Sequence, residues 1–256
     1  IKFLIVCFFK NNQKNHYLED QLNIVYAKIR QTLNNITYKG EVIDFETLLN
    51  KTLKAHNINS SDSMSFKSLY QLMTIVSISA FVSKDYLKIE PFLIQTYKTI
   101  QAHKDKDKQL FYHIQVLYLI ANTLFRNKKF KASFSYLEQM HQYMLLKRKK
   151  YYKSFQLKYN LLLALNYNYS NQQVQAIETL KPFSTSKHQD LESLLDINLS
   201  LVMFYIQSTN YDKALKLFSK FYHTDNYYET RAGKEWVLKK SLIEIILHIE
   251  LKNIDF

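Results

Sequence analysis

The chain has 256 residues, of which 47% are hydrophobic and 15% aromatic, and its formal net charge is +13. It contains only two glycines and two prolines, whereas folds made of strands need many turns with these residues, so the composition argues against an all-β fold and predicts an all-α one. The single cysteine, Cys7, excludes an internal disulfide framework. We expect it to be buried and the compartment to be reducing, which favours a cytoplasmic location.

Apolar residues at helical spacing, separated by polar breaks, predict the helices in chain order. The first apolar run, 1–9, is too short for a bilayer span, which needs about 20 residues, and predicts the end of an earlier helical unit. We therefore expect no membrane span, and a fragment of a longer array. The other predicted helices are 16–34, 43–55, 60–82 capped by Ser60–Ser63, 86–102, 108–125, 131–146, 152–169, 173–182, 190–207, 212–223 and 234–251, with 224–233 as a loop.

A polar turn followed by a helix start recurs along the chain. The residues that follow these turns are separated by 44, 43, 38 and 43 positions; they are Tyr86, Phe130, Gln173, Tyr211 and Ile254. A period of this size is typical of a solenoid, in which helical hairpins stack because no single unit can bury its apolar face alone. We therefore expect an α-solenoid of antiparallel helical hairpins, about 38–44 residues per repeat, forming a single array over 1–256.

The last three hairpins share a pattern of a small residue with a large residue nine positions before it and another four positions after it. The sets are Tyr205, Ala214 and Phe218; Tyr167, Ala176 and Leu180; and Leu124, Ser133 and Leu137, with Ala121 and Ala164 as small residues of the first helices. This pattern resembles the tetratricopeptide repeat, clearly over 101–256 and loosely over 1–100. The period is longer than in that family, and the tryptophan, glycine and proline of its motif are absent at most positions. The resemblance implies a right-handed superhelix.

The resemblance also implies a function. Tetratricopeptide arrays hold a peptide or protein partner in a concave groove lined by the first helix of each hairpin, so we expect a non-catalytic protein–protein interaction scaffold. The polar and aromatic positions expected in this groove are Asn160, Asn166, Tyr167, Asn198 and Tyr205. No set of basic residues matches the carboxylate clamp of the family.

Positive charge is concentrated in 101–158, which has 13 lysines and arginines and three acidic residues. Two clusters are expected on one edge of the array: Lys104, Lys106, Lys108, Lys147, Arg148, Lys149, Lys150 and Lys153. One interpretation is a set of solvated turn residues. The other is a regulatory module whose basic edge binds nucleic acid or another polyanion, although lysine lacks the bidentate fork that arginine uses for base-specific recognition.

No motif for catalysis is present. The eight histidines form no HExxH pattern, and the chain has no glycine-rich phosphate loop and no GxSxG motif. We therefore predict no enzyme activity, no cofactor and no metal. Trp236 is expected to seal the hydrophobic contact between the last two units, and the tyrosine-rich segment 224–233 could offer a contact to a partner.

Overall fold

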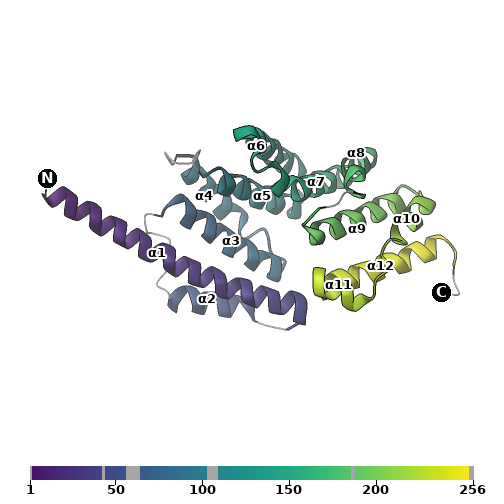
Figure 1. The fold of residues 1–256 in the computed structure, drawn as a ribbon, viewed down its shortest axis with the longest axis horizontal. Helices are drawn as coiled ribbons and strands as arrows, with labels where there is room; N and C mark the ends of the chain where they lie inside the picture. Colours follow the sequence, from purple (N-terminus) through teal and green to yellow (C-terminus); the bar gives the residue numbers. More distant parts are fainter. Residues whose placement is uncertain (1, 42–43, 56–63, 103–108, 186–187, 254–256) are drawn as a thin grey trace. The chain divides into compact units, whose positions relative to one another are not determined.

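The computed structural model describes residues 2–41, 44–55, 64–102, 109–185 and 188–253, and every secondary-structure element in these ranges is a helix (Figure 1). The predicted all-α fold class is confirmed. The chain divides into two compact units. The first unit is Ile1–Asn34 with Val42–Tyr143, and the second is Asn35–Glu41 with Met144–Phe256.

The first unit is built around α3. Its helices are α1 (Lys2–Asn34), α2 (Phe45–Ala55), α3 (Phe66–Ser83), α4 (Glu90–Ala102), α5 (Leu110–Arg126) and most of α6 (Phe130–Lys149). α3 contacts α1, α2, α4 and α5. Within the described ranges α3 alone is long and apolar enough to cross a bilayer, but 44% of it is buried in the structure, as in the core helix of a globular unit.

The extent of α1 and the N-terminal cap of α3 differ from what the sequence predicted. The predicted break between the apolar run 1–9 and the helix from residue 16 is wrong, because α1 is continuous. The polar run between them contains no glycine or proline; lysine and glutamine are good helix formers, and asparagine costs a helix interior at most about 0.7 kcal/mol per residue. The predicted capping residues Ser60–Ser63 lie outside the described residues. The observed cap of α3 is Ser65, whose Oγ accepts a hydrogen bond from the Ser68 backbone N at 3.2 Å and donates one to Glu19 Oε1 of α1 at 2.6 Å.

The second unit combines the C-terminal helices with a short segment from near the start of the chain. Its elements are the π-helical turn η1 (Asn35–Lys39), α7 (Tyr152–Tyr169), α8 (Gln173–Leu180), the 3-10 turn η2 (Lys181–Phe183), α9 (Leu191–Gln207), α10 (Tyr211–Phe218), α11 (Asp225–Ala232) and α12 (Lys234–Glu250). η1 packs against α11 and α12. Gly233, at φ +87°, makes this contact possible, because a Cβ there would lie 2.8 Å from Thr37 Cγ2 and 2.9 Å from Thr37 O.

The predicted loop at 224–233 is also wrong, since most of it forms α11. Thr224 caps this helix: its Oγ1 accepts a hydrogen bond from the Tyr227 backbone N at 3.4 Å. α10 is correspondingly shorter than predicted and ends at Phe218. Trp236 is 4% exposed and packs with Tyr228 and Val237, which agrees with the sealing role expected for it.

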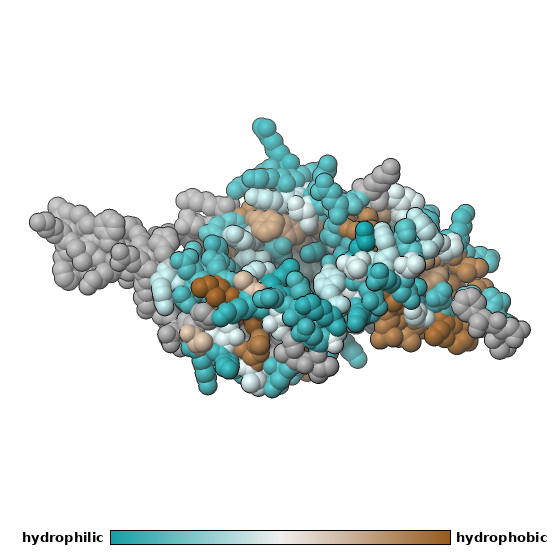
Figure 2. Space-filling view, turned by 60° about the horizontal axis from the view of Figure 1, so that its bottom comes forward, coloured by the Kyte–Doolittle hydropathy of each residue, from teal (hydrophilic) through white to brown (hydrophobic). Residues whose placement is uncertain are grey.

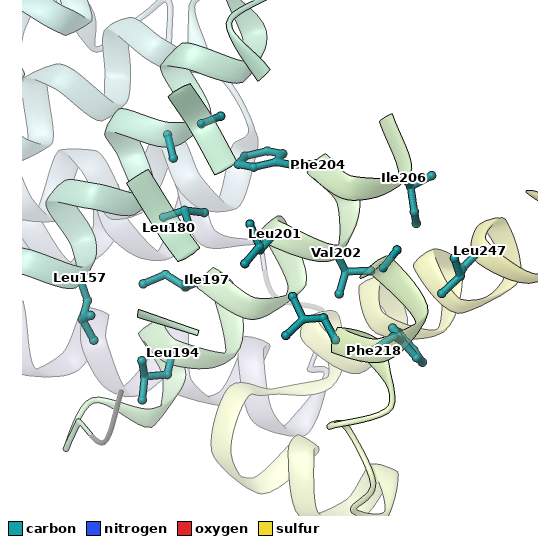
Figure 3. Packing of buried hydrophobic residues seen from close by; sticks show 14 residues of the cluster. Leu157, Leu180, Leu194, Ile197, Leu201, Val202, Phe204, Ile206, Phe218 and Leu247 are labelled. Atoms are coloured by element: carbon teal, nitrogen blue, oxygen red, sulfur yellow. The ribbon is translucent and has the colours of Figure 1, made fainter. Parts of the chain in front are cut away.

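The core of the second unit surrounds α9, which contacts α7, α8, α10, α11 and α12. Figure 3 shows buried side chains of α9 packed against Leu157 of α7, Leu180 of α8, Phe218 of α10 and Leu247 of α12. The small residues Ala164, Ala176 and Ala214 are 0% exposed, so helices approach closely at the positions where the sequence pattern has small residues.

The same turn geometry recurs at the predicted intervals. A residue with left-handed φ of 56–60° stands two positions before each of the five marker residues; these residues are Lys84, Lys128, Asn171, Thr209 and Lys252. In the last four turns a hydrogen bond from the next backbone N to a carbonyl five residues earlier closes the helix end, as from Lys129 to Leu124 at 2.8 Å and from Asn210 to Tyr205 at 2.9 Å.

The helix starts predicted at residues 131, 173 and 212 are correct to within one residue, because α6, α8 and α10 begin at Phe130, Gln173 and Tyr211. The α4 helix begins four residues after its marker, Tyr86, and the last marker, Ile254, lies outside the described residues.

Candidate ligand-binding pocket

α10 is amphipathic, and this property places a row of lysines beside its buried face. Ala214, Leu217 and Phe218 pack into the core around α9. Lys213, Lys216 and the later Lys220 are three and four positions apart, so they follow one side of the α10 segment next to that buried face.

This row of lysines borders a pocket of about 190 Å³ in the second unit. η2 and the residue after it contribute Lys181 and Ser184, and α9 contributes Leu201 and Tyr205. The α10 segment completes the lining with Leu217 and the three lysines. We call the eight lining residues the lysine pocket. Its volume is somewhat larger than the about 150 Å³ of an apolar cavity that accepts a benzene ring, so one apolar side chain fits in it.

The floor of the lysine pocket is apolar. Leu201 is 1% exposed and Leu217 is 7% exposed, and the ring of Tyr205 lies beside them, half-buried. Burial raises the pKa of the Tyr205 phenol, so this side chain is neutral at physiological pH. Lys213 Nζ lies 6.0 Å from the centroid of the Tyr205 ring, at the outer limit of a cation–π contact.

The rim of the lysine pocket carries positive charge that no carboxylate of the described residues neutralises in an ion pair. Lys181, Lys213, Lys216 and Lys220 form no ion pair with any carboxylate among the described residues. An apolar floor below four unpaired ammonium groups suits a ligand that has an apolar group flanked by negative charges. In the described part of the chain, no cluster of three or more histidine, cysteine, aspartate or glutamate side chains could hold a metal ion.

The structure brings one of the five predicted groove residues, Tyr205, to this pocket. Tyr167 packs against the core cluster around α9. The asparagines turn their side-chain nitrogen onto their own helix: Asn160 Nδ2 donates to Gln156 O at 2.7 Å, and Asn166 Nδ2 donates to Leu162 O at 2.8 Å.

Asn198 follows the same pattern, donating to Leu194 O at 3.0 Å. The Oδ1 atoms of Asn166 and Asn198 are buried and accept no hydrogen bond within the described residues, and Asn166 as a whole is 0% exposed. Contact of a partner with Asn160, Asn166 and Asn198 stays a prediction.

The predicted basic edge is described only in part, because Lys104, Lys106 and Lys108 lie outside the described residues. Lys147, Arg148 and Lys149 have φ of 48°, 56° and 61°, so three consecutive residues are left-handed where α6 ends. This conformation costs about 1–2 kcal/mol per non-glycine residue. All three are exposed, as are Lys150 before α7 and Lys153 in its first turn.

The lysines of the pocket were not predicted from the sequence. The spacing of Lys213, Lys216 and Lys220 indicates one side of a helix, but any solvated helix face has the same spacing. Lys181 is 32 positions before Lys213 and reaches the same pocket only because α8 and α10 both pack on α9. No residue pattern along the chain indicates that contact.

No protein-family model, no curated protein and no solved structure matches this chain. The resemblance to tetratricopeptide repeats therefore depends on the residues of the chain itself.

Proposed function

We propose that this chain is a non-catalytic, tetratricopeptide-like binding module whose lysine pocket holds a peptide segment of a protein partner. The segment has an apolar side chain for the pocket floor and acidic residues on either side of it. The observation that carries the proposal is the combination of an apolar floor with four lysines that form no ion pair among the described residues.

The recurring turns support the architectural part of this proposal. One left-handed turn, repeated at intervals of 44, 43, 38 and 43 residues, fits stacked hairpins of similar construction. The close contact of small residues at 121 and 133 fits as well, since Ser133 Oγ donates to Ala121 O at 2.8 Å inside the hairpin formed by α5 and α6.

A peptide fits this pocket better than a nucleic acid does. Lysines provide positive charge without the planar fork that pairs with a base edge. The floor is mostly aliphatic, whereas single-stranded nucleic acids stack their bases on exposed aromatic faces. In a peptide with carboxylates beside a leucine or phenylalanine, the apolar side chain would contact the floor while the carboxylates pair with the lysines of the rim.

The test measures binding of a short peptide in which one leucine is flanked by glutamates, and of a control peptide with glutamines in place of the glutamates. We expect only the acidic peptide to bind, and its affinity to fall as salt rises from about 50 mM to about 300 mM. The variant Lys213→Glu with Lys216→Glu should weaken binding at least about tenfold, because attraction becomes repulsion.

A matched control reverses two lysines of the basic edge, Lys149→Glu with Lys150→Glu, and so changes the net charge by the same amount. This variant should keep the affinity for the acidic peptide. Equal losses in the two variants would mean that only overall charge matters and would contradict the proposal.

The second candidate function is binding of nucleic acid or another polyanion to the basic edge. The observation that favours it is the run of four consecutive exposed basic residues, Lys147–Lys150, in a tight turn. The same two variants separate the candidates when the ligand is a single-stranded oligothymidylate. Loss of oligonucleotide binding in the edge variant alone, with no peptide bound by the unaltered chain, would support the edge and overturn the peptide proposal.

A further inference from the structure

The helix α12 is apolar on two opposite faces. One face is buried in the second unit through Trp236, Val237 and Leu247. The other face carries large side chains that are 36–66% exposed: Leu238, Leu242, Ile245, Ile246 and Ile249. In Figure 2 hydrophobic surface gathers at the right of the view, on the side where Figure 1 places α12.

The spacing of these exposed residues is that of a helix–helix contact. Leu238, Leu242, Ile245 and Ile249 are separated by 4, 3 and 4 positions, which is the heptad pattern of a coiled-coil contact. At 3.6 residues per turn the four lie within an arc of about 60°. We call them the α12 stripe. An α-helix with the same spacing is the partner that interdigitates with such a stripe.

We propose that the α12 stripe binds the α12 stripe of a second copy of this chain, with the two helices antiparallel about a two-fold axis. An axis midway between Leu242 and Ile245 places Leu242 of each copy opposite Ile245 of the other. The same axis places Leu238 opposite Ile249. Every residue of the stripe then meets an apolar partner, as an isologous contact requires.

Charges beside the stripe favour the antiparallel orientation. Lys239 and Glu250 flank the same side of the stripe, 11 positions apart, so antiparallel pairing brings Lys239 of each copy near Glu250 of the other. A parallel pair would instead place Lys234 of one copy next to Lys239 of the other, and like charges would repel.

Both charged residues are placed to take part. Lys239 Nζ lies 2.8 Å from Glu235 Oε1, one turn earlier on the same exposed side, and its side chain is 58% exposed. Glu250 Oε2 accepts a hydrogen bond from Tyr211 Oη at 2.8 Å, which fixes the carboxylate beside the stripe.

The contact is small, so the dimer is expected to be weak. A stable interface buries about 800 Å² on each partner, more than one helical stripe offers, and we expect a dissociation constant of about 1–100 µM.

The test is sedimentation velocity of the full chain over a range of concentrations around the expected dissociation constant. We expect the mass to rise from that of a 30.7 kDa monomer toward a dimer as concentration increases. Leu242→Glu should raise the dissociation constant at least about 30-fold, because it puts two charges into an apolar contact. The control Leu87→Glu alters a leucine that is 67% exposed elsewhere and should leave the dimer unchanged.

Charge exchange tests the orientation. In the antiparallel dimer Lys239→Glu weakens association, and adding Glu250→Lys restores it. In a parallel dimer Lys239→Glu would relieve the repulsion from Lys234 and tighten association. That result, a dimer insensitive to Leu242→Glu, or a monomer at every concentration would each overturn the proposal.

Discussion

Two helices of the second unit, α9 and α12, are both 17 residues long and rich in leucine and isoleucine, yet their surroundings differ. Helices pack around α9 on several sides, and nine of its residues are buried. α12 buries four residues and leaves the α12 stripe exposed. The apolar content of a helix therefore does not determine what it contributes to stability, because the neighbouring helices decide which leucines are covered.

The largest expected effect is a difference in the free energy of unfolding between two leucine-to-alanine variants, one on each helix. Leu201 of α9 is 1% exposed, and Leu201→Ala should lower the free energy of unfolding by about 3–4 kcal/mol through lost burial and the cavity left behind. Leu242 of α12 is 52% exposed, and Leu242→Ala should change the free energy of unfolding by less than about 0.5 kcal/mol.

The measurement is urea unfolding followed by the fluorescence of Trp236, which is the only tryptophan and reports on the second unit. The protein concentration is kept low enough for a monomer. If Leu242→Ala costs as much as Leu201→Ala, the α12 stripe is covered within the chain, and the contrast between the helices disappears.

The next effect concerns the one partly buried carboxylate of α9. Burial raises the pKa of Asp196 to about 6 from an ordinary value of 3.8; Lys239 opposes the rise, whereas Glu192, Asp190 and Glu235 add to it. The folded chain therefore holds this proton more tightly than the unfolded chain does. Stability should fall as pH rises from about 4 to about 6, and the full cost of about 2–3 kcal/mol should be present above that window.

Asp196→Asn removes this titration. The variant should be more stable than the unaltered chain by about 2–3 kcal/mol at pH 7.5, with the gain shrinking toward zero near pH 4. Thermal unfolding at a series of pH values checks the result, with Glu178→Gln, at an exposed carboxylate of α8, as control. A gain that is independent of pH would mean that packing, not ionisation, distinguishes the variant.

The smallest effect concerns the turn that follows each helix. The turn after α9 has Thr209 at φ 56°, and the turn after α12 has Lys252 at φ 58°. A β-branched residue fits the left-handed region worst. Thr209→Gly should therefore stabilise the second unit by about 0.5–1 kcal/mol, and Lys252→Gly by less. A larger gain at Lys252 in urea unfolding would contradict this order.

The turns were predictable from sequence because their signals are local. Polar residues before Phe130, Gln173 and Tyr211 end one helix and begin the next within a few positions. The α11 helix was missed because 225–232 has no apolar periodicity. Its signals stand only at its ends: the cap Thr224, Asp225 in the first turn, and Arg231 and Gly233 at the C-terminal end. The long α1 was missed for a similar reason, since a polar run without glycine or proline can continue a helix as well as end it.

The candidate sites were less predictable because they depend on packing between distant residues. Tyr205 was expected in a binding groove and does line the lysine pocket, but the rim joins Lys181 to Lys213 across α9. The α12 stripe has a readable heptad pattern in the sequence. Its exposure could not be inferred, because the opposite face of the helix is apolar as well.

The segment Asn35–Glu41 has a consequence for synthesis of the protein. Lys234 Nζ donates to Lys39 O at 3.4 Å, and these residues are 195 positions apart. At about 5–20 residues per second, a ribosome needs roughly 10–40 s to make the chain between them. During that time the nascent segment 35–41 lacks α11 and α12, the helices against which η1 packs. The second unit therefore completes its folding last, when α11 and α12 pack against segment 35–41, which was synthesised much earlier.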